Sequence, residues 1–76
     1  MIEELDRVVL TVDVPTHNLK AGDIGVVVLV HGEHEGYELE FVTLDGETVA
    51  VISAFPSQIR PIQSREIAHV RALESA

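Results

Sequence analysis

The chain of 76 residues contains no cysteine and no tryptophan. Without cysteine, neither a disulfide nor a thiolate metal site can stabilise the fold, and such a composition fits a reducing compartment. The aromatic residues are Tyr37, Phe41 and Phe55. They are too few for the exposed aromatic groove that binds proline-rich peptides, and too few to stack the bases of a single-stranded nucleic acid.

Basic side chains are also scarce, because 5 lysines and arginines stand against 13 aspartates and glutamates, for a net charge of −8. Up to residue 62 the lysine and arginine residues are Arg7, Lys20 and Arg60. A nucleic-acid-binding protein needs a basic surface to neutralise phosphates. The composition therefore argues against nucleic acid and favours a basic partner.

Long hydrophobic runs are missing as well. The longest, residues 26–30, is far shorter than the roughly 20 residues that span a bilayer. Glu3, Glu4 and Asp6 occupy the region where a secretory signal would be basic. We therefore expect a cytoplasmic protein without membrane contact. A chain of this length forms one domain with a small core, which favours a binding module over an enzyme.

The residues that are present predict a mainly all-β fold. Apolar alternation and apolar runs predict five strands, at residues 6–14, 24–31, 37–43, 48–54 and 59–62. Asp45-Gly46 is a typical hairpin turn, and residues 55–58 are expected to form one tight helical turn. Because residues 24–31 are apolar on both faces, we expect this strand to be central and covered on both sides.

Gly25 is the most informative single residue for the fold. It follows the turn at Gly22-Asp23 and lies within the second expected strand. A strand interior disfavours glycine, so its presence indicates a bulge, a sharp bend or a close approach of another chain segment.

The C-terminal residues 63–76 follow a different pattern. Ser64 is a suitable helix cap, and Ile67, Val70 and Leu73 have helical spacing. We predict a short helical tail there, next to a β-barrel domain at residues 1–62. Such a tail could pack over the barrel, mediate homodimerisation, or fray.

This order of elements resembles known small barrels. Five short strands, a long first loop and a single-turn break before the last strand resemble an SH3-like barrel, and residues 20–27 resemble its KOW-type version. Residues 5–61, through the runs 5–11, 19–25 and 40–48, resemble a bacterial family of small uncharacterised proteins, a domain of unknown function. The resemblance implies the fold. Some members of that family are encoded beside toxin-like proteins, which implies an antitoxin or immunity role.

Four acidic residues are the first candidate site. Glu38 and Glu40 share one face of the third strand, and Asp45 and Glu47 flank the following turn. They form either a solvated outer face that protects the sheet from edge pairing or an acidic patch for a basic partner.

The histidines are the second candidate. His31 and His34, with Glu33 and Glu35, could bind Zn²⁺ or Ni²⁺, but their spacing matches no closed site and a solvated loop is the simpler interpretation. His17 could form an acid–base pair with Asp13 or Asp23, although no nucleophile motif accompanies it. We therefore assign no catalytic residue, cofactor or metal ligand, and we add His17 and His34 to the partner-binding candidates.

These observations favour a non-enzymatic module that binds a protein partner. An RNA- or ribosome-associated KOW-like module is the alternative, supported by the resemblance and opposed by the charge. A metal-dependent enzyme is the third hypothesis, supported only by the histidine loop.

Overall fold

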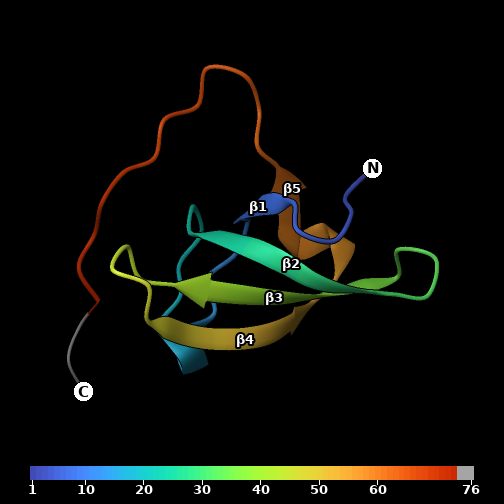
Figure 1. Cartoon of the computed structure of the whole chain (residues 1–76), viewed down its shortest axis with the longest axis horizontal. Helices are drawn as coiled ribbons and strands as arrows, with labels where there is room; N and C mark the ends of the chain where they lie inside the picture. The colour runs from blue at the N-terminus through green and yellow to red at the C-terminus, as the bar shows by residue number, and fades with distance from the viewer. Residues whose placement is uncertain (74–76) are drawn as a thin grey trace.

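A computed structural model describes residues 1–73, in which the strands form one antiparallel sheet (Figure 1). The elements are β1 (Arg7–Leu10), the 3₁₀ turn η1 (Pro15–His17), β2 (Ile24–His31), β3 (Gly36–Val42), β4 (Thr48–Ala54), the 3₁₀ turn η2 (Pro56–Gln58) and β5 (Ile59–Pro61). The five strands lie in the order β4-β3-β2-β1-β5. The mainly β fold with five strands is confirmed. The sheet is not closed into a barrel, because β4 and β5 are its two edges.

The first strand is shorter than predicted. It ends at Leu10, after which Thr11 turns away and donates its N–H to the carbonyl oxygen of Gln58. Val14 pairs only with Leu19, as an isolated bridge, and Pro15 begins η1. Proline cannot donate to a strand ladder, so the chain cannot continue as a paired strand at Pro15. The apolar alternation of residues 6–14 therefore extends beyond the residues that pair as β1.

One face of the sheet carries the core. In β3, Tyr37, Leu39 and Phe41 are buried and alternate with Glu38 and Glu40, as a half-buried strand requires. The other core residues are Val8, Leu10, Leu19, Val27, Ile52, Ala54 and Ile59.

Tyr37 and Phe55 lie in opposite environments. Tyr37 is only 4% exposed, because its cross-strand neighbour Ala54 is small and leaves room for the ring on the core face. Phe55 is 69% exposed. It lies just after β4, where the chain enters η2.

The strand β2 is central but is not covered on both faces. It lies between β1 and β3, yet Ile24, Val28 and Leu29 are 39%, 42% and 44% exposed. The cover on this face is partial, because Val9 of β1, which pairs with Ile24, is only 7% exposed. The apolar run therefore serves the core on one side and an apolar outer surface on the other.

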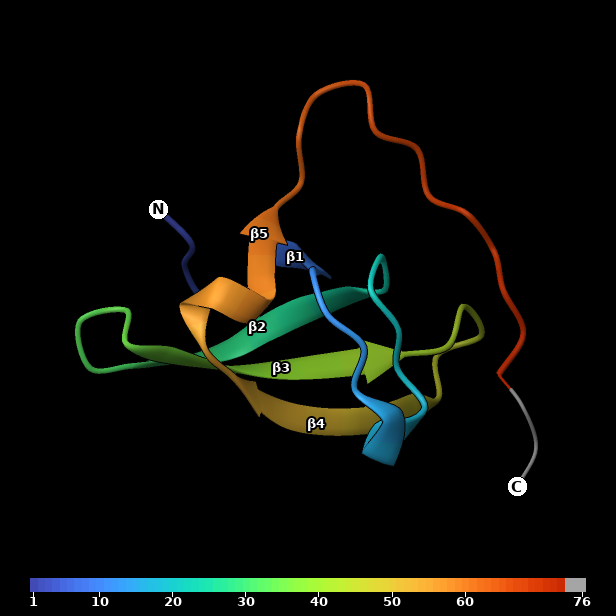
Figure 2. The same ribbon diagram turned by 180° about the vertical axis from the view of Figure 1, so that it is seen from behind.

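The predicted C-terminal helix is absent from residues 63–73, and residues 74–76 of the predicted tail lie outside the described part. Figure 2 shows the tail leaving β5, arching away from the sheet and returning. Two arginine–carboxylate pairs hold the described tail, Arg60 with Glu66 and Arg71 with Asp23. So short a segment is a marginal helix in water, and these contacts fix an extended path instead.

The contact between Arg71 and Asp23 joins the tail to the loop before β2. Arg71 donates from Nε to Asp23 Oδ1 at 2.9 Å and from Nη2 to Oδ2 at 2.5 Å, and it also reaches the carbonyl oxygen of Asn18. The backbone N–H of Lys20 donates to the same carboxylate. Burial raises the pKa of Asp23, but these hydrogen bonds and the charges of Arg71 and Lys20 outweigh it, so the net shift is downward.

No helix within residues 1–73 is long and apolar enough to cross a membrane.

Candidate functional site

The outer face of β3 presents Glu38 and Glu40 side by side. Their side chains alternate with the buried Leu39 and Phe41, so both carboxylates lie on the face opposite the core. Glu38 pairs with Ser53 of β4 across the ladder, and Glu40 with Val51. The predicted shared face of the two glutamates is therefore present.

Hydroxyl groups of β4 hold both carboxylates. Ser53 Oγ donates to Glu38 Oε2 at 2.5 Å, and Thr48 Oγ1 donates to Glu40 Oε2 at 2.8 Å. His31 Nε2 of β2 lies 2.8 Å from the same Glu38 oxygen. The hydrogen bond from Ser53, followed by the contact with His31, lowers the pKa of Glu38. Each glutamate therefore lies against β4 in a defined position.

Exposed apolar side chains flank this acidic pair on both sides. Leu29 pairs with Glu38 from β2 and is 44% exposed, and Val51 pairs with Glu40 from β4 and is 54% exposed. We call the surface formed by Leu29, Glu38, Glu40, Val51 and Ser53 the acidic face. Anionic groups set among apolar ones fit lysine or arginine, because these side chains bury their methylene stems and present a charged head.

Asp45 and Glu47 lie beyond this face, in the turn between β3 and β4. Gly46 has φ +93°, so the turn predicted at Asp45-Gly46 is confirmed, and glycine supplies the left-handed conformation that it needs. The hydroxyl of Thr43 donates to Asp45, and the N–H of Glu47 donates to Thr43 Oγ1. These two acidic residues therefore extend the negative charge past the end of β3.

His34 lies at the opposite end of β3, in the turn after β2. Its Nε2 is 3.3 Å from Glu3 Oε2, and its ring centroid is 6.3 Å from that of Tyr37. The length of β3, roughly 20 Å for a strand of this size, separates it from Asp45 and Glu47. The structure therefore does not bring all the candidate residues into one site.

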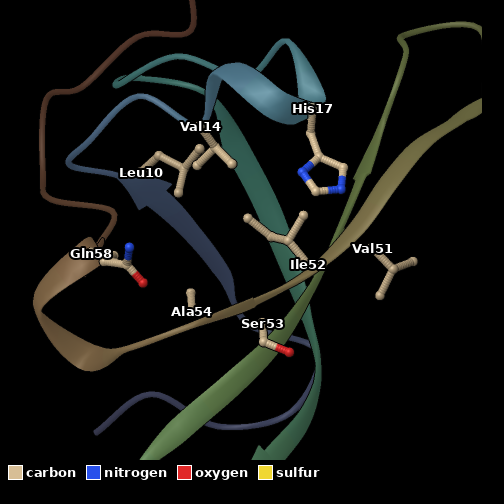
Figure 3. A pocket seen from close by; sticks show the side chains of 8 residues that line it. All are labelled: Leu10, Val14, His17, Val51, Ile52, Ser53, Ala54 and Gln58. Carbon is tan, nitrogen blue, oxygen red and sulfur yellow. The ribbon is translucent and has the colours of Figure 1, made fainter.

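His17 lies on the core side of the sheet, at the rim of a depression of about 250 Å³. Figure 3 shows its ring beside Ile52, with Leu10 and Val14 nearby. The depression is lined by Leu10, Val14, His17, residues 51–54 and Gln58. It is mostly apolar and borders β4, the strand whose hydroxyls hold Glu38 and Glu40.

The histidines pair with separate carboxylates, His31 with Glu38 and His34 with Glu3. Among residues 1–73 no three histidine, aspartate or glutamate side chains come together in a way that could hold a metal ion. Asp13 and Asp23 accept hydrogen bonds from backbone N–H groups of the loop before β2, and His17 instead contacts Thr16. Within the described residues, the geometry offers no acid–base pair at His17.

Sequence reasoning missed Thr48 and Ser53, which position the two glutamates, and it missed the free edge of β4. The turn at Asp45-Gly46 indicates that β4 pairs with β3. A register shift between Phe41 and Val42 separates this turn from positions 50–54, so the turn alone does not give the contacts of Thr48 and Ser53.

Comparison with known proteins assigns the chain to a family. The model of the family described as a domain of unknown function (DUF4926) matches residues 4–61. The chain therefore belongs to this family, and the match ends where β5 ends. Neither the curated proteins nor the solved structures contain a match.

Proposed function

We propose that this chain is a non-enzymatic binding module that engages a protein partner through the acidic face, and that its open sheet is of the SH3-like type. The observation that carries the proposal is the pair Glu38 and Glu40, each held by a hydroxyl of β4 and flanked by exposed apolar side chains. A surface whose side chains are already positioned loses less entropy when it binds.

The overall charge supports a basic partner. A net charge of −8 attracts basic proteins and speeds their encounter. An enzyme that acts on nucleic acid carries a basic surface, which is the kind of surface that an acidic protein attracts. The most specific version of the proposal is therefore that this chain inhibits such an enzyme, as an antitoxin or immunity protein does. The same charge argues against the alternative of an RNA- or ribosome-associated module, because RNA would be repelled.

Affinity capture from cells of the source organism, with quantitative mass spectrometry, tests this function. The bait is compared with the double variant Glu38→Lys/Glu40→Lys and with Glu4→Lys/Glu33→Lys, which changes the net charge equally at exposed residues outside the acidic face. We expect a basic protein that the first variant loses and the second retains. Equal loss of the captured protein in both variants would show that its binding depends only on the net charge of the chain. Tight RNA binding in a low-salt mobility-shift assay would favour the alternative.

A further inference from the structure

The edge of β4 is a place where another strand can pair. β4 is hydrogen-bonded to β3 and is the last strand on that side of the sheet. Its sequence, TVAVISA, contains no charged residue and no proline, the features by which proteins protect an edge. A register shift affects its first residues, but positions 50–54 pair with β3 in continuous register. This stretch is regular enough to accept a further strand.

The depression beside β4 runs along this edge. Its lining includes four consecutive residues of β4, 51–54. Side chains of consecutive strand residues point to opposite faces, so a hollow bordered by all four must border the backbone edge itself. Figure 3 shows Ile52 and Ala54 on the side of Leu10 and Val14, and Val51 and Ser53 on the other side of the ribbon. A strand placed there would have apolar contacts on its inner side.

The outer side of the same edge is acidic. The hydroxyls of Ser53 and Thr48 hold the carboxylates of Glu38 and Glu40 against β4. Neighbouring strands lie roughly 4.8 Å apart, so an added strand would run about 10 Å from β3. A lysine or arginine on its outer side spans this distance by lying over Val51 or Ser53.

We propose that the partner adds an extended segment to β4, with the pattern basic–apolar–basic at three successive positions. The two basic side chains face Glu38 and Glu40, and the apolar side chain between them enters the depression beside Ile52. Backbone hydrogen bonds to β4 supply affinity, and the alternating side chains supply specificity. This inference rests on the proposed function and adds the mode of binding and the chemistry of the bound segment.

The negative charge of the acidic face favours such a segment over a second copy of this chain. Pairing β4 with β4 of another molecule would bring two acidic faces together, each from a chain of net charge −8. A basic segment instead neutralises Glu38 and Glu40. Homodimerisation through β4 is therefore an outcome that the experiment has to separate from partner binding.

The probe is a blocked synthetic nonapeptide with lysine at alternate positions and valine between them, titrated into the full chain and followed by amide NMR shifts. We expect shifts concentrated at residues 50–54, and no binding of the same peptide with glutamate in place of lysine. Two further peptides carry N-methyl groups on alternate amides, one on the odd set and one on the even set. Only one set faces β4, so we expect their affinities to differ at least tenfold.

Matched variants of the chain test where the peptide binds. Val51→Lys places a cation in the middle of the proposed interface, and we expect it to weaken peptide binding at least threefold. Ile62→Lys adds the same charge just beyond β5, at the other edge of the sheet, and we expect less than a twofold change. Thermal melts confirm that both variants fold.

Each contrary result has a distinct meaning. Equal affinity of the two methylated peptides would overturn strand addition while leaving the acidic face as a binding surface. A chain that sedimented as a dimer until Val51→Lys made it monomeric would show that the occupant is a second copy. Failure of the peptide while a captured partner still depends on Glu38 and Glu40 would overturn this inference alone. If neither the peptide nor any captured partner depended on those residues, the proposed function would fail with it.

Discussion

Gly25 faces the ring of Phe41 so closely that a Cβ on Gly25 would lie 2.8 Å from both Cε2 and Cζ of that ring. Gly25 is in β2 and pairs with Val8 of β1, whereas Phe41 is in the core of β3. The ring therefore packs across the backbone of β2, and this packing needs the space that a side chain would fill. This is the close approach that a glycine inside a strand predicts.

The first prediction concerns this contact. We expect Gly25→Val to lower the free energy of unfolding by about 1–3 kcal/mol, because the Phe41 ring must move within a packed core. Gly25→Ala should destabilise less. In the background of Phe41→Leu, which removes the ring, the additional cost of Gly25→Ala should shrink. Chemical denaturation of the four proteins in this cycle measures the coupling; additive effects would show that the ring is not the obstacle.

Much of the fold could be predicted from the sequence because the signals are local. The limits 24–31 and 48–54 agree with β2 and β4, and residues 55–58 do contain a tight helical turn. The alternation around Leu39 and Phe41 identified the core face of β3 correctly. The shared outer face of Glu38 and Glu40 followed from the same period of two.

The remaining features depend on contacts between distant residues. Ile67, Val70 and Leu73 have helical spacing, but the tail is held by Arg60 with Glu66 and by Arg71 with Asp23, and no local pattern reveals the second pair, 48 positions apart. The exposure of β2 depends on how much of its outer face distant segments cover, and Ile24, Val28 and Leu29 stay about 40% exposed. The free edge of β4 became visible only with the strand order.

The second prediction concerns the tail. Truncation after Gln63 should leave the β-type circular dichroism intact, because Ile67 is 93% and Val70 72% exposed and the hydrophobic core contains no described tail residue. Truncation removes both ion pairs of the tail, Arg60–Glu66 and Arg71–Asp23, and its cost should be small because both pairs are partly exposed. Arg71→Ala in the full chain is the matched comparison, which breaks only the second pair and should cost at most about 1 kcal/mol. Global unfolding of the truncated chain would show that the tail completes the core.

The third prediction is the pH dependence of the contact between the tail and the sheet. The folded pKa of Asp23 lies below its usual 3.8, so the contribution of this group to stability is present above that value and is lost as the pH falls through the folded pKa. Limited proteolysis with pepsin, between pH 4 and pH 2, should cut the tail faster as Asp23 becomes protonated. Asp23→Asn should show fast cutting across the whole range. A cutting rate in the native chain that follows only the activity of pepsin would contradict this.

The fourth prediction concerns the hydroxyl that holds Glu38. The hydrogen bond from Ser53 is the largest cause of the lowered pKa of this carboxyl, so Ser53→Ala should raise the pKa towards its usual 4.5. In the native chain the stabilising contribution of Glu38 is present above 4.5 and disappears as the pH falls through the lower folded value. In the variant it should disappear at higher pH. Carboxyl ¹³C titration by NMR measures the shift, and Thr48→Ala, which removes the hydroxyl at Glu40 instead, should leave the titration of Glu38 in place.

The last prediction concerns the rate of association with the captured partner. If the acidic face steers the encounter, the association rate should be high at low salt and fall as added salt screens the charges. Glu38→Lys/Glu40→Lys should slow association and flatten this salt dependence, while the fold stays intact because both side chains lie opposite the core. One charge pair at the rim of an interface contributes only about 0.2–1 kcal/mol, so binding should weaken without disappearing. Glu4→Lys/Glu33→Lys, with the same change in net charge, should keep most of the salt dependence. If the two double variants behave alike in stopped-flow kinetics, Glu38 and Glu40 act only through the total charge, and the partner must contact another part of the chain, with the depression beside His17 as the next surface to test.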